Sequence, residues 1–298
     1  MSIKNFKVLP GEYQEWLHLA LNTKEEMSKE RIRSWYESWD GKVYVSFSGG
    51  KDSTVLLHLA RSIFPDIKAV FINTGLEYPE VVKFVKETEN VDTVRGDMPF
   101  NKVVENYGYP VVSKEISQKL HDIMTTKSDF LRSKRLHGDE KGNGKISEKW
   151  KFLAEADFKI SHQCCAKLKK NPVKKYEKNT GLKPIVGMMA VDSRLREQQY
   201  LTNGCNSFDS KRPTSSPIAF WTEGNVWEYI KKYNVPYSRI YDMGYTRTGC
   251  MFCMFGVHME REEENRFQRM KHTHPTQYNY CINTLGIGKV LDAIKIEY

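Results

Sequence analysis

One short stretch, Ser48–Ser53 (Ser-Gly-Gly-Lys-Asp-Ser), constrains the fold of this chain more than any other. It follows a β-branched and aromatic run at Lys42–Phe47 and precedes the apolar stretch Thr54–Arg61, so the local order is strand, glycine loop and helix. Glycines lack a Cβ and let consecutive backbone N–H groups converge on an oxyanion, to which the following helix adds its positive end. We call this stretch the phosphate loop. The structural alternative is a tight turn capped by Asp52 or Ser53.

Strand-like and helix-like stretches alternate after the phosphate loop. The expected strands are Lys68–Asn73, Val91–Val94 and Pro184–Met188. The expected helices are Pro79–Thr88, which begins with proline, and Thr222–Tyr233, which is capped by threonine. This alternation predicts an α/β fold, a parallel sheet with helices on both faces.

The rest of the chain divides around this core. Residues 1–40 are expected to form an N-terminal helical extension, residues 41–235 the nucleotide-binding α/β domain with a basic insertion at about 113–180, and residues 236–298 a C-terminal, cysteine-containing helical segment. Lys114–Lys178 holds 17 Lys and Arg against 9 Asp and Glu. Such a surplus attracts polyanions, nucleic acid included, although a solvated lysine-rich face gives the same composition. Ser133–Lys149 has the composition of a mobile loop.

Composition excludes a membrane function. Apolar residues make up 40% of the 298 residues, the mean hydropathy is −0.60, and no apolar run approaches the roughly 20 residues of a spanning helix. The first residues lack a secretory signal pattern, so we expect a cytoplasmic protein in which thiols serve metal binding or catalysis.

Four of the six cysteines form two tight pairs, Cys164-Cys165 and Cys250-Met-Phe-Cys253. A Cys-x-x-Cys turn directs both thiolates to one metal centre, which predicts a ligand set. Zinc, buried thiols and a redox dithiol are the alternatives, although adjacent cysteines are awkward ligands for tetrahedral zinc. Cys205 has no partner at a ligand spacing.

Several motifs together resemble the phosphoadenylyl-sulfate (PAPS) and adenylyl-sulfate reductase family of the adenine nucleotide α-hydrolase superfamily. The phosphate loop is similar to the pyrophosphate loop of that superfamily, and the other similar stretches are Phe71–Glu80, Gly187–Arg196, Pro217–Ile230 and Pro236–Cys250. Two departures stand out. Asn73 replaces the usual aspartate, and the family's C-terminal Glu-Cys-Gly-Leu-His tail is absent.

The resemblance implies a site made of these stretches. An adenine nucleotide would be held at the phosphates by Ser48, Gly49, Gly50, Lys51, Asp52 and Ser53, near the base or ribose by Asn73, Thr74 and Gly75, and at the substrate anion by Arg194 and Arg196. Exposed arginines at a helix start are the alternative for the last two. Cys164, Cys165, Cys250 and Cys253 would hold a [4Fe–4S] cluster.

Two enzymatic functions follow from the resemblance, and the sequence favours the first, because the resemblance and the cysteine pattern cover more of the chain than the phosphate loop does. In a sulfonucleotide reductase, Lys51 and Arg194 would serve catalysis, and Cys281 would attack the sulfur of adenylyl sulfate or its 3′-phosphate before a thioredoxin-like thiol donor releases sulfite. Tyr278, Tyr280 and Ile282 around Cys281 equally suit a packed helix. In an ATP pyrophosphatase-type sulfurtransferase, ATP with Mg²⁺ would adenylate a nucleic acid or small-molecule acceptor; the complete phosphate loop is typical of ATP-cleaving relatives. A nucleotide-sensing module without catalysis is a third reading, and the oligomeric state is left open.

Overall fold

The computed structural model describes residues 7–260 and 263–298, which group into two compact units. The first unit comprises residues 7–72, Tyr78–Val94 and Val173–Thr248. The second comprises Asn73–Glu77, Arg95–Pro172 and the described part of Gly249–Tyr298. The expected N-terminal helices therefore belong to the first unit, and most of the basic insertion shares the second unit with the C-terminal segment.

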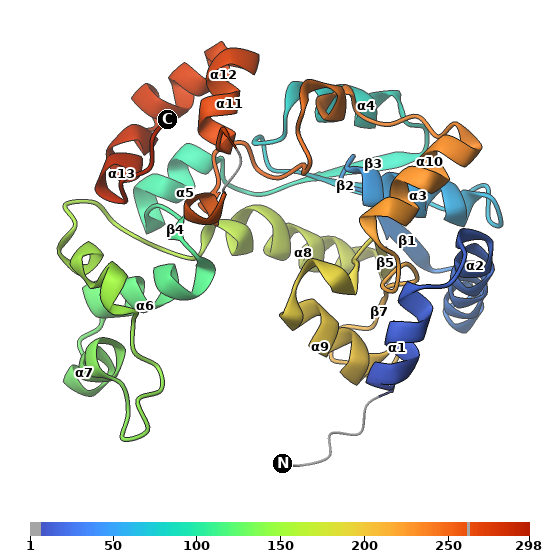
Figure 1. Cartoon of the computed structure of the whole chain (residues 1–298), viewed down its shortest axis with the longest axis horizontal. Helices are drawn as coiled ribbons and strands as arrows, with labels where there is room; N and C mark the ends of the chain where they lie inside the picture. The colour runs from blue at the N-terminus through green and yellow to red at the C-terminus, as the bar shows by residue number, and fades with distance from the viewer. Residues whose placement is uncertain (1–6, 261–262) are drawn as a thin grey trace. The chain divides into compact units, whose positions relative to one another are not determined.

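A six-stranded sheet in the order β3-β2-β1-β5-β7-β6 forms the first unit. The strands are β1 (Val43–Ser46), β2 (Ala69–Asn73), β3 (Val91–Arg95), β5 (Lys183–Val186), β6 (Asn206–Ser207) and β7 (Thr214–Ser215). β1 pairs in parallel with β2 and β5, β5 with β7 likewise, and β6 runs antiparallel to β7. Helices cover both faces of the sheet (Figure 1), so the predicted α/β fold with a mostly parallel sheet is confirmed.

The first unit contains seven α-helices among its described residues, of which α4 and α10 begin and end close to the expected positions. They are α1 (Pro10–Leu17), α2 (Leu21–Ser38), α3 (Lys51–Arg61), α4 (Pro79–Glu87), α8 (Asn171–Thr180), α9 (Arg194–Asn203) and α10 (Glu223–Tyr233). Helix α4 starts with Pro79, whose fixed φ suits a first helical position. Helix α10 is capped by Thr222, whose side chain accepts from the N–H of Asn225, as the sequence predicts. Helix α3 packs against β1, α2 and α10.

The second unit is mainly helical. It contains α5 (Phe100–Tyr107), α6 (Lys114–Thr125), α7 (Asp129–His137), α11 (Arg266–Thr273), α12 (Pro275–Asn279) and α13 (Ile287–Ala293), together with the short parallel pair β4 (Val111–Val112) and β8 (Met254–Phe255). The stretch expected to be a mobile loop is more structured than its composition indicates. Its first residues complete α7, and Ile146 is fully buried. No helix among the described residues is both long and apolar enough to cross a bilayer.

A buried lysine joins the N-terminal helices to helix α10. Lys24 of α2 is fully buried, and its Nζ donates to the carbonyl of Leu17 at 2.9 Å and to Oδ1 of Asn225 at 2.6 Å. Asn225 Oδ1 also accepts from the N–H of Thr222 at 3.0 Å, which completes the capping box of α10. Burial lowers the pKa of Lys24. The N-terminal helices therefore supply a buried ammonium group that fixes the start of α10.

We predict that Lys24→Met destabilises the protein by about 1–3 kcal/mol, because it leaves the Leu17 carbonyl without its ammonium donor and removes one of the donors to Oδ1 of Asn225. Chemical denaturation followed by far-ultraviolet circular dichroism measures the effect. The matched control is Lys83→Met on α4, where the exposed ion pair with Glu87 contributes little and a change below about 0.5 kcal/mol is expected. Equal stability of the two variants would contradict the structural role of Lys24.

Candidate functional site

Strand β1 leads directly into the phosphate loop, and helix α3 starts within it. Gly49 has a φ of +72°, and a Cβ there would lie 2.8 Å from Cγ1 of Val81, so the position requires glycine. The hydroxyl of Ser53 donates to the carbonyl of Gly50 at 2.9 Å and accepts from the N–H of Ser48 at 3.1 Å. These bonds close the loop on itself at the N-terminus of a helix, the arrangement that binds phosphates through backbone donors.

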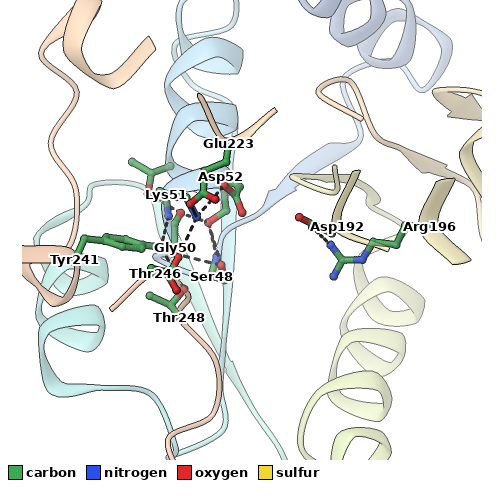
Figure 2. A network of polar contacts seen from close by, with 12 residues as sticks. Ser48, Gly50, Lys51, Asp52, Asp192, Arg196, Glu223, Tyr241, Thr246 and Thr248 are labelled. Carbon is green, nitrogen blue, oxygen red and sulfur yellow. Dashed lines mark hydrogen bonds and ion pairs between the residues drawn. The ribbon is translucent and has the colours of Figure 1, made fainter. Parts of the chain in front are cut away.

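The ammonium of Lys51 lies at the centre of a polar network around the loop (Figure 2). Its Nζ is 3.1 Å from Oε1 of Glu223 and 3.7 Å from Oδ1 of Asp52, and it donates to the carbonyl of Thr246 at 3.2 Å. Lys51 is only 5% exposed. Burial opposes its charge, yet the neighbouring carboxylates outweigh burial and raise the pKa of Lys51 above its ordinary value. Lys51 is therefore a fixed cation in the site.

A cavity of about 550 Å³ opens beside the phosphate loop. Its lining carries as many acidic as basic side chains, namely Asp52, Asp192 and Glu223 against Lys51, Arg196 and Arg247. Burial is the main cause that raises the pKa of Asp52; Lys51 opposes it, and Asp192 and Glu223 reinforce it. Oδ1 of Asp52 is buried without a hydrogen-bond partner among the described residues. The cavity thus pairs anion-binding groups with a carboxylate that has an unused acceptor.

The two predicted arginines occupy different places. Arg196 lines the cavity and forms an ion pair with Asp192. Arg194 is the first residue of α9, where it is exposed and stands apart from the cavity lining. The anion-binding role of both arginines stays a prediction, and the geometry supports it for Arg196 alone.

The predicted base or ribose residues, Asn73–Gly75, belong to the second unit. The N–H and hydroxyl of Thr74 donate to the carboxylate of Glu77 at 3.0 and 2.7 Å, and the N–H of Gly75 donates to Oδ1 of Asn73 at 2.9 Å. The hydroxyl of Thr74 also lies 4.0 Å from Sγ of Cys250. The motif therefore forms a compact turn beside a cysteine, and its contact with adenosine stays a prediction.

All four cysteines of the predicted ligand set lie in the second unit. The Cys-x-x-Cys turn is closed by the N–H of Cys253, which donates to the carbonyl of Cys250 at 3.1 Å. Burial raises the pKa of Cys164, and Cys165, Cys250 and Cys253 add to this shift through their charges. The charges of the other three thiols thus act on Cys164. Within residues 7–260 and 263–298, no three His, Cys, Asp or Glu side chains are placed to hold a single metal ion.

A lysine accompanies the thiols. Burial opposes the charge of Lys169, but interactions with Cys250 and Glu77 outweigh it and raise the pKa of Lys169. Lys169 follows Cys164 and Cys165 by one turn, in the π-helical segment Ala166–Lys170. An ammonium at this position favours the thiolate form of the nearby cysteines, which is the form that binds metals.

Cys281 differs in its surroundings from the four cysteines of the predicted ligand set. It is fully buried in the π-helical turn Tyr280–Thr284, and burial raises the pKa of its thiol. A cysteine nucleophile needs an accessible thiolate with a lowered pKa. The surroundings of Cys281 therefore favour the packing role that the sequence left open.

Several basic side chains of the insertion form ion pairs within the second unit. These pairs join Lys119 to Glu115, Arg135 to Asp122, Lys134 to Asp139, and Lys151 to Glu148. These pairs lie within the insertion and leave its net surplus of basic residues unchanged, and nucleic-acid binding stays a prediction.

Sequence reasoning missed Tyr241, Glu223 and Asp192 as members of the site. Each falls inside a stretch that resembles the family, but nothing in the sequence indicates contact with the phosphate loop. The N–H of Lys51 donates to the hydroxyl of Tyr241 at 2.8 Å across a separation of 190 residues. Only the arrangement of strands brings such distant positions together.

Comparison with known proteins finds similarity over most of the chain. Residues 42–110 and 102–255 match the phosphoadenosine phosphosulfate reductase domain family. An uncharacterized protein of Methanocaldococcus jannaschii is 26% identical over 274 residues, which cover 88% of this chain and 52% of that protein. The adenosine 5′-phosphosulfate reductase of Bacillus mycoides is 24% identical over 251 residues, which cover 82% of this chain and 88% of the reductase.

The lengths of the relatives differ. The chain spans about half the length of two Methanocaldococcus jannaschii proteins that it matches, 52% and 41%. Among solved structures, a phosphoadenylyl-sulfate reductase from Candida auris in a phosphate complex is 16% identical, with a TM-score of 0.44 over 82% of this chain and 96% of that chain.

We predict that Cys281→Ala lowers the free energy of unfolding by about 1 kcal/mol, the effect of a small void in a packed core, and leaves turnover of adenine nucleotides unchanged. Denaturant unfolding and phosphorus NMR measure the two effects. Cys205→Ala is the matched control, because Cys205 is partly exposed and lies in the other unit. A folded Cys281→Ala variant that binds adenylyl sulfate but releases no sulfite would establish Cys281 as the nucleophile instead.

Proposed function

The chain belongs to the phosphoadenosine phosphosulfate reductase domain family, and on that premise we propose that it binds MgATP at the phosphate loop and transfers the adenylyl group to an acceptor. The observation that carries this proposal is the balance of charge in the cavity beside the loop, where three carboxylates face three cations. The proposed enzyme is an adenylating sulfurtransferase, one of the two functions that the sequence left open.

The balance of charge discriminates between substrates. A sulfonucleotide is an anion without a required metal, so Asp52, Asp192 and Glu223 would oppose its attraction to the cations. For MgATP the same carboxylates become favourable, because Mg²⁺ is held by phosphate oxygens together with one or two carboxylates. The cavity of about 550 Å³ is in the size range of ligand pockets. Carboxylates at a phosphate site therefore favour the ATP reaction.

Each residue of the loop has a role in this proposal. The backbone N–H groups at the start of α3 would hold the β- and γ-phosphates, with the positive end of the helix behind them. Lys51 is a buried cation that would neutralise charge on the leaving pyrophosphate. Oδ1 of Asp52, which has no hydrogen-bond partner among the described residues, would bind the magnesium of the substrate.

The proposed reaction is balanced by ATP and the acceptor alone. An acceptor oxygen forms a bond to the α-phosphorus, the bond from that phosphorus to the bridging oxygen breaks, and pyrophosphate leaves with the magnesium. The acceptor loses a proton to solvent. The adenylated acceptor is then open to a sulfur nucleophile of the sulfide or persulfide class, which displaces AMP. A nucleic acid acceptor stays a prediction from the basic insertion.

The four neighbouring thiols fit an iron–sulfur cluster better than a single ion. A [4Fe–4S] cluster takes one thiolate on each of four different irons, so its ligands need not approach one common point. The electrostatic interaction of Cys164 with the other three thiols agrees with such a ligand set. Cys164, Cys165, Cys250 and Cys253 would hold the cluster, which would supply electrons or a site for sulfur. Lys169 would offset its negative charge.

Thiol-dependent reduction of adenylyl sulfate or phosphoadenylyl sulfate is the second candidate. Its support is membership of the family and similarity to a bacterial adenosine 5′-phosphosulfate reductase over 88% of that enzyme. The buried position of Cys281 weighs against it, because the reductase reaction needs an accessible nucleophile.

We predict that ATP, and not a sulfonucleotide, is consumed when the anaerobically purified, iron-replete protein is incubated with Mg²⁺, a thioredoxin system and each nucleotide in turn. Phosphorus NMR would show AMP and pyrophosphate as products, and their amounts would increase when the acceptor is present. Asp52→Asn should lower this turnover by about 10²-fold or more, because it removes the charge that holds magnesium. The matched control is Asp66→Asn, which alters an exposed carboxylate outside the cavity lining.

Two results would overturn this proposal. One is conversion of adenylyl sulfate or its 3′-phosphate to sulfite with ATP untouched, which would establish the reductase. The other is full ATP turnover by Asp52→Asn.

We further predict that anaerobic reconstitution with iron and sulfide yields about four irons per chain and visible absorption from the cluster. Cys250→Ser should lose most of the bound iron, whereas Cys205→Ser should retain it because Cys205 lies in the other unit. Iron and sulfide content and the visible spectrum are the measurements. Stoichiometric zinc in the protein as purified, with no iron retained on reconstitution, would contradict the cluster.

A further inference from the structure

A segment distant in sequence covers the phosphate loop. We call Tyr241–Thr248 the strap. The hydroxyl of Tyr241 accepts from the N–H of Lys51 at 2.8 Å, and the carbonyl of Thr246 accepts from Nζ of the same residue at 3.2 Å (Figure 2). A Cβ added to Gly50 would lie 2.5 Å from Oγ1 of Thr248. The strap and the loop belong to the same unit, and both contribute to the lining of the same cavity.

The bond from Lys51 to Tyr241 uses a donor that a phosphate would use. The N–H of Lys51 is the first of helix α3, and the first N–H groups of a helix have no partner within it. In a phosphate loop these groups bind the oxyanion. One N–H makes one well-aligned hydrogen bond. The Tyr241 hydroxyl and a phosphate oxygen therefore compete for it.

We propose that Tyr241 occupies the position of a phosphate oxygen and that nucleotide binding exchanges its hydroxyl for that oxygen, which displaces the strap. This inference rests on the phosphate-binding role given above to the loop. A charged oxyanion wins the exchange because hydrogen bonds to ionised acceptors are roughly twice as strong as bonds to neutral ones. A ligand without phosphate, such as adenosine, leaves the strap in place. Tyr241 thereby makes the site selective for phosphate-bearing ligands.

A tryptophan next to Tyr241 can report the exchange. Trp227 of α10 stands edge-on to the Tyr241 ring, with the centroids 5.5 Å apart. Tyr237 has a similar position, with its centroid 5.4 Å from that of Trp227, but its hydroxyl donates to Asp242 at 3.1 Å and not to the loop. Tyr237 is therefore a matched control for Tyr241.

The decisive measurement is the affinity of inorganic pyrophosphate for Tyr241→Phe, determined by calorimetry. Loss of the competing hydroxyl should tighten binding by about twofold to tenfold, the worth of one neutral hydrogen bond. Tyr237→Phe should bind as the unsubstituted protein does. A merely structural role of Tyr241 would weaken binding or leave it unchanged, and either result would overturn the proposal.

Two further readouts follow the strap itself. Pyrophosphate should change the tryptophan emission, adenosine should not, and Trp227→Phe should remove most of the change. Amide exchange in the strap should accelerate on addition of pyrophosphate; unchanged exchange together with unchanged emission would overturn the displacement.

Pyrophosphate binding needs no turnover, so the two proposals can fail separately. If Tyr241→Phe tightens pyrophosphate binding while ATP is not cleaved, the exchange stands and the adenylating function falls. If pyrophosphate does not bind to any variant, the phosphate site and the exchange fall together.

Discussion

The burial of one ammonium group organises the nucleotide-binding unit. Lys51 is almost completely enclosed at the start of α3, and a buried cation is tolerated only when carboxylates and carbonyls surround it. Glu223 and Thr246, which come from the region after the sheet, meet this requirement. The start of α10 must in turn be held in place, and the buried Lys24 does so through the capping box. The N-terminal helices thus support the site through the start of α10.

In the second unit a largely buried lysine is again surrounded by negatively charged groups, here thiolates as well as a carboxylate. Four thiols, one carboxylate and one ammonium form a small group in which Lys169 remains charged despite its burial. The turn that contains Thr74 is part of this group through Glu77 and through the approach of its hydroxyl to Cys250. A motif that the family resemblance associates with adenosine therefore lies beside the predicted cluster ligands. Each unit thus holds a largely buried lysine together with groups that keep it charged, Lys51 in the first unit and Lys169 in the second.

Local patterns predicted the fold well and the site only in part. The strand before the phosphate loop, the proline at the start of α4 and the threonine cap of α10 depend on neighbours in the chain, and all three were predicted from sequence. Two of the carboxylates in the cavity, Asp192 and Glu223, could not be predicted, because they approach Asp52 only after the strands pair. Composition gave the net charge of the insertion but not which lysines pair with its carboxylates, such as Lys119 with Glu115.

The sequence by itself determined the strand, loop and helix around Ser48–Ser53, and the alternation of strands and helices that makes the sheet parallel. It also determined the close spacing of two pairs of cysteines. These features depend on residues a few positions apart. Tertiary structure decided which charges meet, which thiol is buried and which segment covers the loop. The physical reason is that desolvation and Coulomb interaction depend on distance in space and on exclusion of water. Tyr241 beside Lys51 and Cys281 inside the core are therefore properties of the folded chain alone.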